Sequence, residues 1–218
     1  MRKFERIAIS LGMVGILIYL SHTLLGRILW AEYNPVTMDI SSLTAEGAPN
    51  AGLLRVLTTV YGLCMIVFAI GMVSRAFRKS GALVRAGSVT LLVMEGVSMF
   101  GYMLFPLSGD KTVLTFGNLM HIIVTVVVVL TTIACGFLLA AGFLKREKLT
   151  GLGRFTLVMA VLITLTGMTT PIGMASGWNL LGVTERLSIY SLQTMLFVLS
   201  AYFTFFKSER VLRIIPKV

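Results

Sequence analysis

Six long apolar stretches with almost no charged residue constrain the fold of this chain more than any other feature. No charged side chain occurs between Arg6 and Arg27, or between Lys111 and Lys145. The hydrocarbon core of a bilayer is about 30 Å thick, and a helix crosses it with about 20 mostly apolar residues. Because backbone groups in lipid must bond within their own segment, uninterrupted apolar stretches favour helices over the alternating strands of a barrel. The sequence therefore predicts an all-α integral membrane protein.

Residues 1–218 are interpreted as a single transmembrane domain, with all six helices in one bundle. Of these residues 56% are hydrophobic and 13% are charged, about half of the roughly 25% that is typical of a soluble domain. Several connections are short, so consecutive helices are expected to be antiparallel neighbours. The six transmembrane helices are expected near residues 7–30, 53–74, 86–105, 119–144, 155–175 and 187–206.

The basic residues are distributed unevenly between the two sides of the predicted bundle. Fifteen Lys and Arg residues lie at the termini and in the second-to-third and fourth-to-fifth connections, whereas four lie on the other side. Cytoplasmic loops of membrane proteins carry the excess of Lys and Arg, so both the N and the C terminus are predicted to be cytoplasmic. The formal net charge of +10 then follows from topology, and nucleic acid is not expected as a partner.

Polar side chains recur at helical spacing within several predicted spans. Glu95 lies near the middle of the third span, where a carboxylate costs about 2.5–3.5 kcal/mol, and it shares a stripe with Ser98 and Tyr102. Polar residues inside a membrane face the bundle interior or a wet cavity. We therefore predict a polar vestibule that is open to the outside, with Glu95 at its floor. The predicted ligand-binding residues are Arg55, Glu95, Ser98, Tyr102, Asp110, His121, Arg186, Tyr190 and Gln193.

A structural role is the alternative for each of these residues. Ser and Thr in a membrane helix commonly bond to the preceding turn or to a neighbouring helix, which contributes about 0.6 kcal/mol. Glu95 is equally consistent with a protonated, hydrogen-bonded carboxyl that only stabilises the bundle. Arg55 and Arg186 are equally consistent with cations that extend to the lipid headgroups or pair with nearby carboxylates.

The chain has two histidines, His22 and His121, and both are candidate metal ligands. Two histidines from facing helices are able to ligate haem, so haem or another metal is kept as an alternative. No CxxC, HExxH, GxSxG, phosphate-loop or dinucleotide-binding motif occurs in the chain. No cofactor and no catalytic residue is therefore predicted, and a non-enzymatic role is favoured.

Four segments on the predicted outer side carry a family resemblance. They are "DISSLTAEGAPNAGL" after the first span, "MLFPLSGD" at the end of the third, His121 at the start of the fourth, and "GVTERLSIY" at the start of the sixth. In their order and placement they resemble the uncharacterised prokaryotic six-span membrane family filed as domain of unknown function 998. This resemblance implies a multi-pass protein of the prokaryotic cytoplasmic (inner) membrane, without an assigned reaction. The residues that it shares on the outer face are Ser42, Pro106, Asp110, His121, Glu185 and Arg186.

A more remote resemblance concerns the first outer loop. An Ile-Ser…Gly-x-Pro loop followed by a histidine at an outer helix end resembles the six-span family of eukaryotic autophagy modulators and yeast lipid-asymmetry factors. This chain has "EGAPN" where that family has a shorter acidic-Gly-Pro loop.

Three functions are consistent with these residues. The leading hypothesis is a protein that binds or organises a lipid or small amphiphile in the vestibule, where Arg55 and Arg186 hold an anionic headgroup. Membrane lipids are then the expected partners, and a homo-oligomer is left open. The first alternative is a small proton-coupled transporter or exporter that uses Glu95, and the second is an intramembrane lipid hydrolase, or a metal or haem site, that uses His121 and Asp110. The sequence does not identify the ligand or the partner of Glu95.

Overall fold

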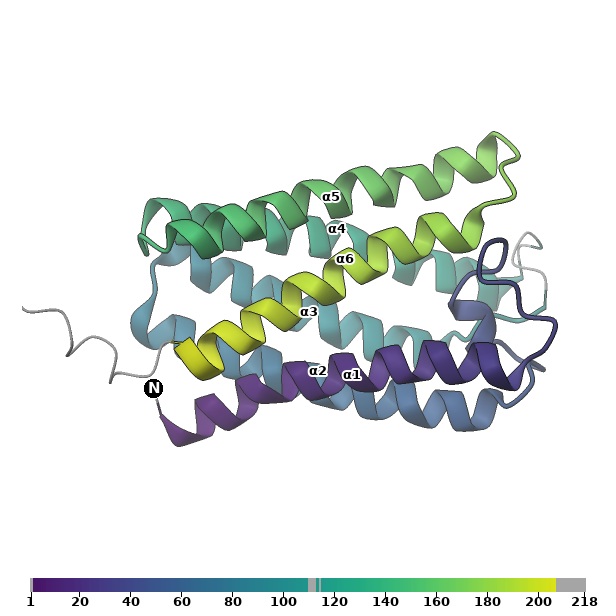
Figure 1. Cartoon of the computed structure of the whole chain (residues 1–218), viewed down its shortest axis with the longest axis horizontal. Helices are drawn as coiled ribbons and strands as arrows, with labels where there is room; N and C mark the ends of the chain where they lie inside the picture. Colours follow the sequence, from purple (N-terminus) through teal and green to yellow (C-terminus); the bar gives the residue numbers. More distant parts are fainter. Residues whose placement is uncertain (1, 110–112, 114, 207–218) are drawn as a thin grey trace, which may run out of the picture.

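The computed structural model is a ring of six antiparallel helices in which each helix packs on its neighbours in the sequence and the last helix returns to the first (Figure 1). The structure describes residues 2–109, 113 and 115–206. All six helices are long and apolar enough to cross a membrane, which confirms the predicted fold class. They are α1 (Lys3–Leu29), α2 (Ala51–Lys79), α3 (Ala82–Leu104), α4 (Phe116–Lys145), α5 (Thr150–Ala175) and α6 (Leu181–Ala201), and a π-helical turn, Tyr202–Phe206, continues α6.

The helices extend beyond the apolar stretches from which they were predicted. The largest difference concerns α6, which begins at Leu181 instead of near residue 187. The first turns of α6 contain Thr184, Glu185 and Arg186, whose polar side chains do not mark a membrane span in a hydropathy pattern. These residues are helical because their side chains find partners within the protein, as described below.

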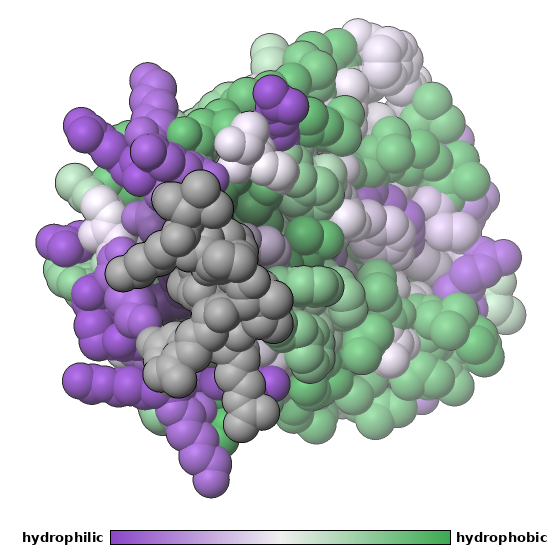
Figure 2. Space-filling model, turned by 60° about the vertical axis from the view of Figure 1, so that its left-hand side comes forward, coloured by the Kyte–Doolittle hydropathy of each residue, from purple (hydrophilic) through white to green (hydrophobic). Residues whose placement is uncertain are grey.

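The two ends of the bundle differ in charge. We call the end with the N-terminus and the connections 80–81 and 146–149 the basic end, and the opposite end the loop end. The connections at the loop end include residues 30–50 and 176–180. Figure 2 shows hydrophilic residues gathered at the basic end, whereas the sides of the helices are mostly hydrophobic. This division is the one expected of a bundle whose sides face lipid.

Large apolar side chains fill the half of the ring interior near the basic end. Phe68, Phe143 and Phe203 have no exposed surface and belong to one continuous cluster. At the same level α6 crosses α1 closely, because Ser200 Oγ donates to the carbonyl oxygen of Ile9 at 2.6 Å and accepts from the Met13 N–H at 3.1 Å. In Figure 1, α6 approaches α1 at this end and diverges from it toward the loop end. The polar residues of interest lie in that diverging half.

Candidate functional site

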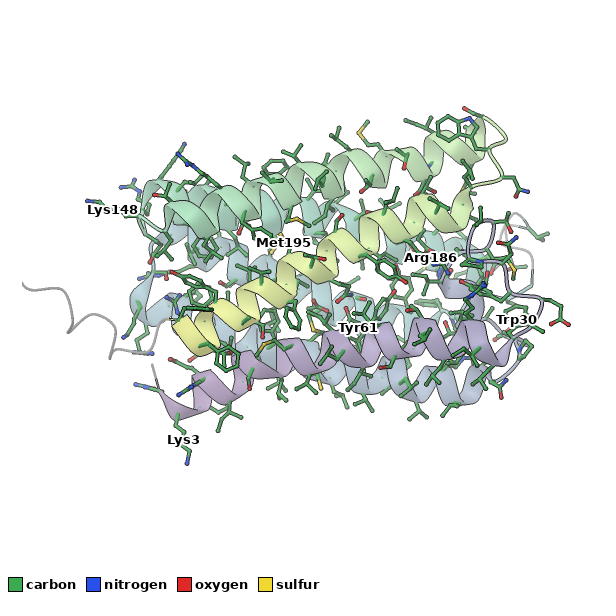
Figure 3. The ribbon with its side chains drawn as sticks, in the orientation of Figure 1. Lys3, Trp30, Tyr61, Lys148, Arg186 and Met195 are labelled. Carbon is green, nitrogen blue, oxygen red and sulfur yellow. The ribbon has the colours of Figure 1, made fainter. Side chains whose placement is uncertain are left out.

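The 30–50 connection folds over the loop end and is held there by Arg186. The guanidinium Nη1 donates to the carbonyl oxygens of Pro35 at 2.7 Å and Met38 at 3.0 Å. Nη2 donates to the hydroxyl of Tyr33 at 2.5 Å, and the guanidinium carbon lies 5.5 Å from the centre of the same ring. Figure 3 shows Arg186 beside this connection. Arg186 therefore fastens α6 to a segment that is about 150 residues away in the chain.

Two carboxylates order the same connection. Glu185 accepts a hydrogen bond from the Ile40 N–H at 2.5 Å. Asp39 is 2% exposed, and its carboxylate accepts hydrogen bonds from the hydroxyl and the backbone N–H of Ser42. These bonds hold the first turn of the short 3₁₀ helix Ser41–Thr44. Tyr33 donates to the Asp39 carbonyl oxygen at 2.7 Å, and its burial raises its pKa to about 12. The connection is thus an ordered cap with its own hydrogen-bond network.

This cap changes the expected shape of the site. Sequence analysis predicted a vestibule open to the outside, but Ile40 and Leu43 of the cap are buried and pack with Leu54 against Tyr19 and Tyr190. In the part of the chain that the structure describes, apolar side chains of the cap therefore cover the loop end of the bundle at α1, α2 and α6. Sequence analysis did not predict that the 30–50 connection folds back on the bundle with Ile40 and Leu43 turned toward it.

A groove of about 340 Å³ runs along the contact between α5 and α6, on the side of the bundle. Leu187 and Thr194 in its wall are exposed, which places the groove on the outer surface of the ring. Arg186 lies toward the loop end of the α6 wall. The lining residues are Met159 of α5 and Val183, Arg186, Leu187, Tyr190, Ser191 and Thr194 of α6. Most of the lining is apolar, with one cation and several hydroxyl groups.

The Arg186 guanidinium has donors left over for a ligand in this groove. An arginine side chain has five N–H donors. Nη1 is directed at the carbonyl oxygens of Pro35, Met38 and Gly182, and one Nη2–H is directed at Tyr33. Within the described ranges, the Nε–H and the second Nη2–H have no hydrogen-bond partner.

A second polar cluster lies inside the ring. Gln193 Nε2 of α6 donates to the hydroxyl of Tyr61 of α2 at 2.8 Å, although these helices are not neighbours in the ring. The rings of Tyr61 and Tyr19 of α1 are 4.8 Å apart. Tyr190 of α6 donates to the Thr23 hydroxyl of α1 at 3.4 Å. Figure 3 shows Tyr61 near the middle of the bundle.

Glu95 belongs to this interior cluster. The side chain is 2% exposed, and its Oε1 accepts no hydrogen bond from the described part of the chain. Glu95 and Tyr102 each interact electrostatically with Tyr61. Ser98, one turn after Glu95, and Tyr102 are half-buried. Of the predicted ligand-binding residues, the structure thus brings Glu95, Tyr102 and Gln193 together around Tyr61.

The remaining predicted residues have other surroundings. His121 Nδ1 is bonded to the carbonyl oxygen of Phe105 at 2.9 Å, and its ring lies 4.9 Å from that of Tyr102. Arg55 is exposed on α2, where its Nε donates to the Thr44 carbonyl oxygen at 2.9 Å. Asp110 lies outside the described residues, so its predicted role beside His121 stays a prediction.

The described residues contain no group of three or more His, Cys, Asp or Glu side chains that could hold a metal ion. His22, the other histidine that was considered for metal or haem, is 1% exposed next to Tyr19, with 5.7 Å between the ring centres. Neither of its ring nitrogens has a hydrogen-bond partner among the residues that the structure describes. His22 is therefore a buried polar group beside the interior cluster.

Sequence reasoning missed Tyr61, which links the helices of this cluster. Arg55 was the residue of α2 that was predicted for the site, and the nearby Thr58 and Thr59 both donate to its carbonyl oxygen within their own helix. Tyr61 lies seven residues after Leu54, which the structure shows to be buried, so both residues lie on the inward face of α2.

A family model described as "Protein of unknown function (DUF998)" matches residues 13–202 of the chain. The match covers most of the sequence and reaches all six helices, so the chain belongs to this family. The resemblance predicted from the outer segments is thereby confirmed. No match was found among the curated proteins, and none among the solved structures.

Proposed function

We propose that this membrane protein, as a member of a family of unknown function, binds a membrane lipid in the groove between α5 and α6. In this proposal an acyl chain lies along the apolar wall and a phosphate headgroup bonds to Arg186. The observation that carries the proposal is the position of Arg186 at the loop end of a mostly apolar groove on the side of the bundle. A lipid has the same arrangement of one polar end and a long apolar chain.

The size of the groove supports a single acyl chain as the occupant. Its volume of about 340 Å³ is near the lower end of the range of ligand pockets, which is about 300–1,000 Å³. Leu187 and Val183 provide branched aliphatic surface, and Met159 provides a flexible thioether that adapts to an irregular chain. The groove is open along its side, so a lipid can enter from the membrane without passing the cap.

The chemistry of Arg186 supports a phosphate as the polar end. A guanidinium recognises phosphate through two parallel N–H donors in one plane, whereas the ammonium group of a lysine acts as a point charge without this fixed geometry. The Nε–H and the second Nη2–H are the donors left over from the cap. Arg186 would then bind the headgroup and the cap at the same time, and the acidic residues Glu185 and Asp39 would stay engaged with the cap.

The orientation follows from the distribution of basic residues. We infer that the basic end faces the cytoplasm, because cytoplasmic segments carry the excess of Lys and Arg. The groove would then lie in the outer half of the cytoplasmic membrane, and its lipid would come from the outer leaflet.

The experiment is mass spectrometry of the intact protein, purified in a mild detergent and supplied with phosphatidylglycerol. Leu187→Trp should fill the groove without touching the cap, and it should reduce bound phosphatidylglycerol at least fivefold. Arg186→Ala should also reduce it. Arg55→Ala removes an exposed cation outside the groove and serves as the matched control.

The outcome for Leu187→Trp decides the proposal, because this variant keeps the hydrogen bonds of the cap. If it retains as much phosphatidylglycerol as the unmodified protein, the groove is not the lipid site. An equal loss in Arg55→Ala would likewise overturn the assignment, since it would show that any cation at the loop end has the same effect.

A further inference from the structure

We propose that the interior of the ring contains a second site, separate from the groove, which binds a small organic cation. Four tyrosines would surround the cation, and Glu95 would supply the opposite charge. The proposal rests on three observations: the gathering of aromatic rings from four helices, a set of buried acceptors without donors, and the absence of a cation beside Glu95 among the described residues.

The aromatic rings come together from α1, α2, α3 and α6. Tyr19 lies 4.8 Å from Tyr61 and interacts electrostatically with Tyr102 and Tyr190. Four of the six tyrosines of the chain are thus within electrostatic range of Tyr19 or are Tyr19 itself, and one pair of them is in ring contact. The face of an aromatic ring is electron-rich and attracts a cation, and cages of such rings are the usual sites for substituted ammonium groups.

Two side chains of the interior cluster carry buried acceptor atoms that have no donor among the described residues. Oε1 of Glu95 and Oε1 of Gln193 are buried and accept no hydrogen bond, although the two side chains are only 2% and 4% exposed. Neither ring nitrogen of His22, next to Tyr19, has a partner among the described residues, so the acceptor nitrogen of its neutral ring is also left without a donor. A buried polar atom without a partner costs free energy, so several such acceptors in one place favour a ligand that brings donors or positive charge.

Glu95 has no cation of the protein beside it. Within the described ranges no Lys or Arg forms an ion pair with Glu95, and the spans around it contain no other charged residue near their middle. A carboxylate inside a membrane normally pairs with an opposite charge or lines a functional site. A positively charged ligand would satisfy this requirement, and an anion would be repelled.

The rings retain surface that a ligand could contact. The side chains of Tyr19, Tyr61 and Tyr102 are each half-buried. Tyr61 of α2 extends across the interior of the helix bundle to Gln193 of α6. Tyr190 lines the outer groove and also donates to Thr23 of α1, so it separates the groove from the interior.

The character of the site favours an organic cation over a metal ion. A divalent metal takes several carboxylate, imidazole or thiolate ligands, and the described residues offer no such group of three. Aromatic faces with one carboxylate instead match a singly charged ammonium that carries methyl or alkyl groups.

The test is calorimetric titration of the full chain in detergent with choline and with its uncharged isostere 3,3-dimethylbutan-1-ol. We expect choline to bind and the isostere to bind at least tenfold more weakly. Glu95→Gln should weaken choline binding at least tenfold. Tyr61→Leu should do the same, whereas Tyr61→Phe, which keeps the ring, should change it by less than about threefold.

Glu32→Gln, which removes an exposed carboxylate at the loop end, is the matched control and should leave binding unchanged. If Glu95→Gln does not fold, the Tyr61→Leu and Tyr61→Phe pair gives the same information. Equal binding of choline and its isostere, or no binding of choline, would overturn the proposal. Leu187→Trp should not affect choline binding, so failure of the lipid proposal and failure of this one can be distinguished.

Discussion

Replacing Gly182 with alanine should detach the cap from α6. Gly182 lies in the first turn of α6, directly beneath the segment that Arg186 holds. A Cβ added at this position would fall well inside 3.0 Å of the carbonyl oxygens of Met38 and Pro35, and 2.8 Å from Arg186 Nη1. Both oxygens belong to the backbone, so no side-chain rotation relieves the overlap. The cap must therefore move away from the helix.

The expected loss follows from the bonds that this movement breaks. Arg186 donates to two cap carbonyl oxygens and Glu185 accepts from the Ile40 N–H. A hydrogen bond to a charged group contributes about 1.5–3 kcal/mol, but water at the loop end replaces part of it, so we expect a net loss of about 2–4 kcal/mol. For a chain of this size, this loss lowers the melting temperature by roughly 5–15 °C.

The two cysteines of the chain provide the assay. Cys135 is buried and Cys64 half-buried, and both are free thiols, so a thiol-reactive dye reports thermal unfolding in detergent. Gly52→Ala is the matched control, because its Cβ at the start of α2 would meet no atom within 4 Å. Hydrogen exchange of residues 33–46 measures the cap directly. An unchanged melting temperature together with unchanged exchange in Gly182→Ala would refute the reasoning.

Two further predictions concern helix packing and the cap. Gly87→Ala should lower the free energy of unfolding by about 1–3 kcal/mol, because its Cβ would lie 2.9 Å from the Leu139 side chain and 3.1 Å from the Leu139 backbone nitrogen. Gly96→Ala on the same helix meets no atom within 4 Å and should cause no such loss in the same dye assay, and an equal effect of the two would contradict this account. Burial raises the pKa of Tyr33 to about 12, so the folded protein holds the Tyr33 proton more tightly than the unfolded chain does. The resulting contribution to stability is complete below about pH 10 and is lost as the pH rises toward 12. Tyr33→Phe should therefore show a smaller fall in melting temperature over this pH range, and an identical fall would contradict the prediction.

Much of the fold was predictable from local composition. The apolar stretches predicted the number of spans, because insertion of a helix into a membrane depends mainly on its own side chains. The helix ends were less predictable. Polar residues such as Glu185 and Arg186 extend α6 beyond its apolar stretch, and their suitability for a helix depends on the cap that they contact.

The site was predictable only in part. The polar stripe on α3 correctly placed Glu95 inside the bundle, since a carboxylate facing lipid would be too costly. Arg186 was recognised as a polar residue at the loop end, but not as the anchor of a segment near Pro35. Tyr61 was missed because its spacing from Leu54 indicates an inward face only once Leu54 is known to be buried, which the structure shows and the sequence does not.

The sequence by itself determined that this chain crosses a membrane six times and that its two ends differ in charge. Both properties follow from the hydropathy and charge of individual residues and do not depend on contacts between distant parts of the chain. The tertiary structure alone decided that Tyr61 meets Gln193 across the ring and that Leu43 covers the loop end. These contacts depend on the rotation of each helix and on close crossings such as that at Ser200, which are set by pairs of residues far apart in the chain.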